Sequence, residues 1–530
     1  MLPGSPATPD NLSSQQWNLE MIGAFQAQTI TGGSPDVRVA LIDSGIDPGH
    51  PEFQGRIDTA NSVSCITGTP VKDPTGALWR DNVGHGTHVA GLIAAGDNDF
   101  GTVGVAPNVQ LLIVKVTDPG LPITPQAAAC AFKYVSQQNV DVANASFAVD
   151  KGATGSADPL DFFCRSDPAD LASIQLVAGA VKDALKSGTT IVASAGNNGI
   201  DMTQPAAGSG CIRMPVQLPG VIGVASEGKN GDPVMATPPG PSNFGLGAID
   251  LVAPGGDPAQ GGVPGGLILS TFPSYIPVPP TAMPSIVDGP PGATYRYNAG
   301  TSMAAAQVSG VAALVSGRFA KLSAFGFLKP LKPLLIRTLL DRTAEAKACP
   351  PDPRCVGTEQ YNGFYGFGQV DAHAAVTAFG FDVGVVLAIG DGGAATLARI
   401  TQAQVDDTRD GVRAVLRGGA ITQHLDGFDG RQRYRIEIDG GRTAAYRAVD
   451  VHQRGWMTTL AVDQHECLIG REASQGCGAD VVGAIGDRRP RKIERGSGIA
   501  KRFGELGGAL RGECLLGKHI HGRQGFEPCA

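Results

Sequence analysis

The chain has 530 residues and a formal net charge of −7 at pH 7, and 42% of its residues are hydrophobic. A chain of this length accommodates two or more domains, or one large domain with extensions. Its acidic balance argues against a general nucleic-acid-binding protein. Because no run of 18 or more apolar residues occurs, the sequence predicts no membrane-spanning helix.

Charge is shared unevenly along the chain, which indicates a domain boundary. Residues 1–380 contain 21 Lys and Arg against 30 Asp and Glu, whereas residues 381–530 contain 21 against 19. In the second part, Arg433–Ile438 and Met457–Val462 alternate like half-exposed strands, and the final stretch has no periodicity. We therefore predict four parts: an N-terminal extension at 1–36, a main domain at 37–380, a small β-rich appendage at 381–465, and a poorly ordered Gly- and Arg-rich tail at 466–530.

The first strong structural signal is an aliphatic run that ends in an aspartate. Val37–Ile42 is rich in β-branched and aliphatic residues, which predicts a buried parallel strand with Asp43 at its C-terminal end. In open α/β sheets, sites form at that end of the strands. The alternative for Asp43 is a turn that merely terminates the strand.

The second signal is a histidine held between two glycines. His85 opens a run of small residues that predicts a helix. A buried core histidine is one alternative interpretation. A His85/His88 metal pair is another, but the spacing lacks an intervening glutamate and a third ligand nearby, which argues against it.

Strand and helix patterns alternate through the rest of the main domain. Strands are predicted at 109–116, 140–147, 189–195, 221–226 and 249–255, and helices at 126–138 and 171–187. This alternation predicts an α/β fold, in which a three-layer, doubly wound and mostly parallel sheet carries helices on both faces. No glycine-rich phosphate-binding motif follows a strand, so nucleotide binding has no support. Gly- and Pro-rich insertions at 150–170 and 257–295 are expected to lengthen surface loops.

The third signal is Ser302, which follows Gly300-Thr301 and begins a helix of small residues. At a helix N-terminus a serine hydroxyl is exposed beside free backbone N–H groups and the positive end of the helix dipole. This setting suits a nucleophile whose reaction generates an oxyanion. An ordinary capped helix start is the alternative.

Together, four segments resemble the signature blocks of the subtilisin-like serine proteases, in that family's order Asp…His…Ser. The blocks are Ile42–Gly45, His85–Gly91, Ala195–Asn197 and Gly300–Ala304. The resemblance covers roughly residues 14–380. It implies a subtilisin-like fold and a serine endopeptidase that acts on proteins or peptides. The alternative is a catalytically silent binding module of the same fold.

The resemblance also implies a role for individual residues. Ser302 would attack the peptide carbonyl, His85 would transfer the proton, and Asp43 would orient His85. Asn197 would donate its amide to the oxyanion. Nothing acidic stands at the implied pocket positions, so we expect a neutral or apolar residue before the scissile bond. The implied substrate-binding residues are Ser146, Phe147, Ala148, Ser194, Ala195 and Gly196.

A structural calcium ion is the only metal that the resemblance suggests, and no cofactor is implied for the chemistry. Residues 96–102 stand where many family members have a calcium-binding loop, with Glu52 and Asn98 as the implied ligands. Carboxylate and amide oxygens suit Ca²⁺. A solvated polar turn is the alternative.

Ten cysteines form an even set without any Cys-x-x-Cys motif, which favours an oxidising, secreted setting. Cys349 and Cys355 bracket a turn-rich loop that a local disulfide would close. The first residues show no signal-peptide pattern, and only 42 residues precede Asp43, too few for the family's usual propeptide. Either export is not used, or the open reading frame begins inside a longer precursor. A further alternative is that the chain as written lacks its propeptide and stays immature. We expect a monomer.

Overall fold

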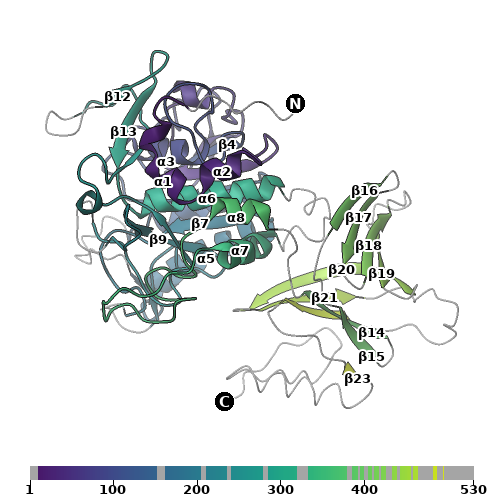
Figure 1. Cartoon of the computed structure of the whole chain (residues 1–530). Helices are drawn as coiled ribbons and strands as arrows, with labels where there is room; N and C mark the ends of the chain where they lie inside the picture. Colours follow the sequence, from purple (N-terminus) through teal and green to yellow (C-terminus); the bar gives the residue numbers. More distant parts are fainter. Residues whose placement is uncertain are drawn as a thin grey trace. The chain divides into compact units, whose positions relative to one another are not determined.

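The structure is a computed structural model of the chain, which divides into two units, Met1–Ala378 and Phe379–Ala530 (Figure 1). Each unit is described by itself. In the first unit the structure describes residues 10–151, 162–204, 210–234, 240–278, 285–318 and 332–378. In the second unit it describes only the backbone of ten strands.

The centre of the first unit is an eight-stranded sheet with the order β10-β9-β7-β5-β1-β4-β2-β3. All neighbouring strands run parallel except the pair β2 and β3. This arrangement confirms the predicted α/β fold. The strands are β1 (Arg38–Asp43), β2 (Val63–Ser64), β3 (Val71–Lys72), β4 (Gln110–Lys115), β5 (Val142–Ala145), β7 (Thr190–Ser194), β9 (Ile222–Glu227) and β10 (Leu251–Pro254).

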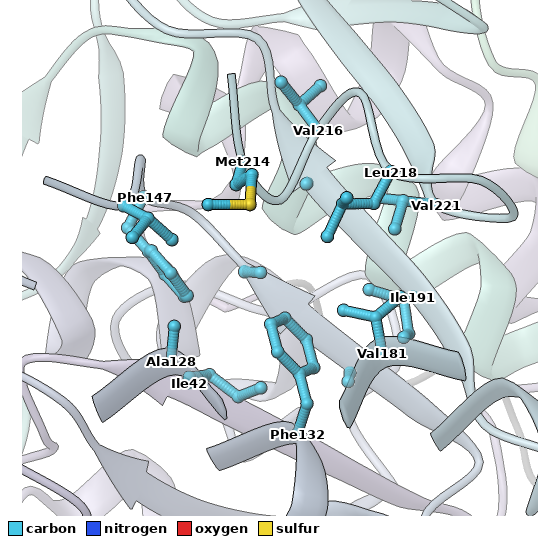
Figure 2. Close-up of a cluster of buried hydrophobic side chains, with 14 of the residues drawn as sticks. Ile42, Ala128, Phe132, Phe147, Val181, Ile191, Met214, Val216, Leu218 and Val221 are labelled. Carbon is cyan, nitrogen blue, oxygen red and sulfur yellow. The ribbon is translucent and has the colours of Figure 1, made fainter. Parts of the chain in front are cut away.

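Helices cover both faces of this sheet. On one face, α4 (Pro125–Val135) and α5 (Pro168–Lys186) pack over the strands, where Phe132 and Val181 lie near Ile191 (Figure 2). The other face carries α3 and α6, which contact each other and several strands. The remaining helices are α1 (Trp17–Met21), α2 (Ala24–Gln28), α3 (His85–Ala94), α6 (Thr301–Arg318), α7 (Lys332–Thr343) and α8 (Ala372–Thr377).

Strand β1 explains why its sequence is a continuous apolar run. Ala40 and Ile42 belong to the core cluster beneath α4 and α5. Val39 and Leu41 alternate with them and therefore face the opposite layer. All four side chains are fully buried. A parallel strand covered on both faces needs apolar side chains on both, which is why no polar alternation occurs.

The N-terminal extension packs on the main domain. Leu19 is fully buried in α1, and the Asn18 side chain donates to Gln307 Oε1 in α6 at 3.2 Å. Near the C-terminus of the unit, Gln369 Nε2 donates to the carbonyl of Met21 at 2.7 Å. The backbone N–H of Ala372 donates to Ile22 at 2.8 Å. The first two helices are therefore tied to α6 and to the start of α8.

The two predicted loop insertions contain buried structure that the sequence did not indicate. In the second insertion, β11 (Ile268–Thr271) is fully buried and joins β12 (Ile286–Val287) and β13 (Thr294–Asn298) in an antiparallel sheet. In the first, β6 (Phe163–Cys164) pairs with β8 (Cys211–Ile212). These short strands depend on distant partners, which local composition does not reveal.

The second unit forms a ten-stranded sheet with the order β16-β17-β18-β19-β20-β21-β22-β14-β15-β23. The two segments that alternation predicted as strands, Arg433–Ile438 and Met457–Val462, are present as β19 and β21. Most of the predicted tail at 466–530 lies outside the described residues. The strands are β14 (Val385–Asp391), β15 (Ala394–Ala398), β16 (Gln404–Thr408), β17 (Gly411–Leu416), β18 (Gly419–His424), β19 (Arg433–Ile438), β20 (Arg442–Arg454), β21 (Met457–Asp463), β22 (Val481–Ile485) and β23 (Ile493–Glu494).

Candidate active site

Strand β1 and helix α3 bring a carboxylate and an imidazole together. Asp43 is the last residue of β1, and His85 is the first residue of α3. His85 Nδ1 lies 2.7 Å from Asp43 Oδ1, which also accepts the Ser44 backbone N–H at 2.8 Å. Burial would lower the pKa of His85, but the charge of Asp43 and this hydrogen bond outweigh it and raise the pKa above 6.5.

Gly86 allows α3 to begin this close to the end of β1. A Cβ atom on Gly86 would stand 2.1 Å from the carbonyl oxygen of Gly45. Any other residue would force the helix start away from the strand. The glycine after His85 is therefore required by the contact that places the imidazole beside Asp43.

Ser302 lies in the first turn of α6 and is 8% exposed. Its hydroxyl donates to the carbonyl of Ser146 at 3.2 Å, and the Ser146 hydroxyl donates to the Ser302 carbonyl at 3.1 Å. Among the residues that the structure describes, Ser302 Oγ has no hydrogen bond to His85. Catalytic hydrogen bonds are often long or misaligned before substrate binds.

Asn197 follows β7, and its amide has a defined orientation. Its Oδ1 accepts the backbone N–H and the hydroxyl of Thr301, at 2.9 Å and 3.0 Å. The Thr301 hydroxyl in turn accepts the Gly196 N–H at 3.0 Å. Because Oδ1 accepts both bonds from Thr301, the NH₂ group of Asn197 takes no part in them. A Cβ atom on Gly300 would stand 3.3 Å from Asn197 Nδ2.

A buried aspartate that the sequence reasoning missed holds the start of α3. Asp81 is fully buried. Its carboxylate accepts five hydrogen bonds, all between 2.7 Å and 3.0 Å: from Ser44 Oγ, Val83 N, Gly84 N, Thr87 N and Thr87 Oγ1. It therefore satisfies the free N–H groups of the helix start and fixes the residue after Asp43. The sequence signal for this role was the position of Asp81, four residues before the predicted helix start at His85, where aspartates often accept hydrogen bonds from free N–H groups.

The predicted pocket residues lie on two segments beside Ser302 and Asn197. Phe147 is 9% exposed and packs into the core near Met214 (Figure 2), while Ala148 is half-buried. On the other segment Ser194 and Ala195 are buried and Gly196 is partly exposed. Of these residues, Gly196 and Ala148 present the more accessible surface.

His88 lies deeper in α3 and does not pair with His85. It is buried, and its Nε2 lies 3.0 Å from the carbonyl of Arg296. Burial lowers its pKa to about 3, so the ring is neutral. This environment agrees with a packed core histidine.

The two implied calcium ligands meet in a buried polar cluster. Glu52 is fully buried and accepts hydrogen bonds from Asn98 Nδ2 at 2.9 Å and from the Tyr295 hydroxyl at 2.7 Å. Burial raises the pKa of Glu52 to about 8 and that of nearby Asp10 to about 6. Both carboxyl groups therefore lack a full compensating positive charge.

Three oxygens of this cluster bear on whether a cation fits. Asp10 Oδ2, Asn98 Oδ1 and Thr102 Oγ1 are buried and have no hydrogen-bond partner among the described residues. Carboxylate, amide and hydroxyl oxygens are hard donors of the kind that Ca²⁺ binds. No group of three or more His, Cys, Asp or Glu side chains in the described part of the chain has metal-binding geometry. Because these donors are all oxygens, they fit calcium better than a transition metal.

Three disulfides cross-link the first unit. The predicted local bridge Cys349–Cys355 is present. Cys65–Cys130 and Cys164–Cys211 are also present, and the sequence had not assigned these pairs. The other four cysteines lie outside the described residues.

This fold, together with the family and the relatives that the chain matches, defines the class as a serine-type endopeptidase. The chain belongs to the Subtilase family, whose model matches residues 34–368. No helix in the described part of the chain is long and apolar enough to cross a membrane.

Known proteins resemble the chain to different extents. Fervidolysin of Fervidobacterium pennivorans is 31% identical over 345 residues, which are 63% of this chain and 41% of that relative. Subtilisin DY of Bacillus licheniformis is 29% identical over 58% of this chain and 86% of its own length. The match therefore spans less than half of the first relative and most of the second.

Solved structures share the fold at lower identity. A lanthipeptide protease superposes with a TM-score of 0.55 and 24% identity, covering 71% of this chain and 99% of that one. The nisin leader peptidase NisP of Lactococcus lactis gives a TM-score of 0.51 and 18% identity, with coverage of 69% and 94%. These likenesses support the fold alone.

Proposed function

We propose that this chain hydrolyses peptide bonds through an acyl-enzyme formed on Ser302. The observation that carries the proposal is the 2.7 Å contact between His85 Nδ1 and Asp43 Oδ1. It fixes the tautomer that leaves His85 Nε2 unprotonated, as a general base requires. The raised pKa of His85 also helps it to hold the transferred proton.

The reaction proceeds in two halves. Ser302 Oγ attacks the carbonyl carbon while His85 Nε2 takes its proton, and the developing oxyanion receives N–H groups from Asn197 Nδ2 and from the Ser302 backbone. His85 then gives the proton to the leaving amine, which breaks the peptide bond and leaves an ester on Ser302. Water attacks this ester with the same assistance and releases the acid product.

A structural calcium ion at Glu52 and Asn98 is part of the proposal. The orphaned oxygens of Asp10 and Asn98 and the raised pKa of Glu52 support it. The ion would stabilise the loop at 96–102 and would take no part in the chemistry. Three disulfides support a secreted enzyme. That it acts as a monomer on protein or peptide substrates, without nucleic acid, stays a prediction.

Casein hydrolysis and labelling with a fluorophosphonate test the proposal. The wild type is expected to hydrolyse casein and to take one label per chain, and Ser302→Ala is expected to do neither. Ser173→Ala changes a serine on α5 whose hydroxyl donates to the carbonyl of Ala169 in the same helix, and it serves as the matched control. Equal labelling of wild type and Ser302→Ala would exclude Ser302 as the nucleophile. A folded wild type that neither labels nor hydrolyses would favour the binding-module alternative.

A further inference from the structure

Arg213 lies beside the pocket segment that precedes the oxyanion amide. It follows β8 and is only 4% exposed. A Cβ atom on Gly196 would stand 2.6 Å from Asn243 Nδ2 and 3.7 Å from Arg213 Nη2, so the guanidinium lies close to this residue, next to the Asn243 amide. Gly196 immediately precedes Asn197. The charged group is thus one residue away from the groups proposed to hold the substrate carbonyl.

The backbone next to Arg213 contacts the opposite pocket segment. The carbonyl of Met214 accepts the backbone N–H of Val149 at 2.8 Å, and Met214 packs in the same core cluster as Phe147 (Figure 2). Arg213 therefore stands between the segment that contains Gly196 and the segment that contains Phe147. These are the two segments that the family resemblance implies as the borders of the pocket for the side chain before the scissile bond.

The surroundings of Arg213 hold its position. Its backbone N–H donates to Gln217 Oε1 at 2.8 Å, and its guanidinium carbon lies 5.8 Å from the centre of the Phe162 ring. Two residues earlier, Cys211 is bridged to Cys164, which fixes the short sheet of β6 and β8. The arginine is thus presented by a cross-linked element.

A buried guanidinium close to the predicted pocket residue Gly196 favours one class of substrate side chain. Its planar N–H groups match the two oxygens of a carboxylate, and such hydrogen bonds are stronger where water is excluded. A lysine or arginine side chain would meet a like charge there, and an apolar one would add no hydrogen bond to the guanidinium.

From this geometry we infer that the enzyme selects glutamate or aspartate as the residue before the scissile bond, with Arg213 as the specificity-determining residue. This acidic preference replaces the neutral or apolar one expected from the sequence. That expectation depended only on residues near the signature blocks, and Arg213 lies outside them. The inference rests on the proposed function, because it concerns the substrate of the same site.

Two peptide substrates that differ only in charge test the inference. Succinyl-Ala-Ala-Pro-Glu-p-nitroanilide and its Gln counterpart have nearly the same shape, so the ratio of their kcat/KM values isolates the charge. Rates are normalised to the serine that a fluorophosphonate titrates. The wild type is expected to favour the Glu peptide about 10- to 100-fold, the range for hydrogen bonds to charged groups. Arg213→Gln is expected to bring the ratio to about 1, and Arg213→Lys to retain part of it.

Arg165→Gln is the matched control, because Arg165 is an exposed arginine next to the same disulfide, and its ratio is expected to equal that of the wild type. Titratable wild type that cleaves both peptides equally would overturn the inference and leave the proposed function intact. The inference would also be overturned if Arg213→Gln kept the full wild-type ratio. If Arg213→Gln does not fold, Arg213→Lys takes its place in this comparison. Loss of the ratio in Arg165→Gln would overturn the inference as well. A wild type without a titratable serine would overturn both.

Discussion

The hydroxyl of Ser44 donates to the carboxylate of Asp81 at 2.9 Å and accepts the backbone N–H of Gly86 at 3.0 Å. One serine thereby connects the residue after Asp43 to the residue after His85. The distance between β1 and α3 is thus fixed by side chains that take no direct part in the proposed chemistry.

Asp81→Ala tests this connection. It would leave five donors without an acceptor, so we expect it to lower the free energy of unfolding by about 3 kcal/mol and to reduce kcat, because His85 is no longer held. Urea unfolding, measured in the Ser302→Ala background to prevent self-digestion, gives the first quantity. Asp183→Asn is the control, since its exposed ion pair with Lys133 contributes less than about 1 kcal/mol. Equal stability of the two variants would contradict the role given to Asp81.

Asn197→Ala tests the oxyanion donor. We expect kcat to fall by about 10² to 10³ with little change in KM, a magnitude taken over from the corresponding amide of a subtilisin. Steady-state kinetics on a p-nitroanilide peptide measures both constants, with Asn230→Ala, an exposed asparagine, as the control. A change in KM alone would show that Asn197 binds the substrate without stabilising the transition state.

Asp43→Asn tests the coupling between the carboxylate and His85. Activity of the wild type is expected to fall as the pH drops through the raised pKa of His85, above 6.5, because the protonated ring is no base. Without the charge of Asp43, burial lowers this pKa, so the acid limb of the profile moves to lower pH. We expect kcat to fall about 10⁴-fold, as in other Ser-His-Asp enzymes. An unmoved acid limb would assign it to another group.

Glu52→Gln tests the calcium proposal through stability. Between its usual pKa of 4.5 and about 8, folded Glu52 holds a proton that the unfolded chain has lost, so its contribution to stability falls as the pH rises across this window. We therefore expect that, in EDTA, raising the pH from 5 to 8 lowers Tm of the wild type more than it lowers Tm of Glu52→Gln. Both proteins carry Ser302→Ala.

Calcium should reverse this loss, because it binds the deprotonated carboxylate. Added Ca²⁺ is expected to raise Tm of the wild type more at pH 8 than at pH 5, and to leave that of Glu52→Gln almost unchanged. An equal Ca²⁺ effect on both proteins would place any calcium site elsewhere.

The disulfides should differ in their contribution to stability. The chain-entropy model gives about 4 kcal/mol for Cys164–Cys211, with a sequence separation of 47, and about 2 kcal/mol for Cys349–Cys355, with a separation of 6. Replacing each pair by alanine and measuring urea unfolding checks the ranking. The opposite ranking would indicate that strain or residual structure outweighs loop closure.

The sequence predicted those parts of the fold and site that local patterns determine. The apolar run ending at Asp43 was recognisable as a strand because a strand covered on both faces needs apolar residues on both. The small residues after Ser302 were recognisable as a helix because α6 is buried through most of its length. Predicted elements such as 109–116 and 171–187 are present with ends shifted by a few residues. Boundaries depend on capping contacts such as Asp167 at the start of α5.

Features that depend on distant partners were not predictable. β11 is buried because α3 and β13 lie against it. The 2.7 Å hydrogen bond from Ser270 Oγ to the His88 carbonyl is one of its contacts with α3. Arg213 stands in a short segment without any motif, and only the fold brings it close to Gly196. The sequence likewise gave no reason to pair Cys164 with Cys211, since many pairings of ten cysteines are possible.

The bond from Gln369 to Met21 joins residues 348 positions apart, and it has a consequence for biosynthesis. At elongation rates of about 5–20 residues per second, a ribosome needs roughly 20–70 s to supply the second partner after the first. Until then α1 lacks its hydrogen bond to the segment that precedes α8. The contacts between the N-terminal helices and the start of α8 therefore form late in translation, after the segment that contains Ser302 has been made.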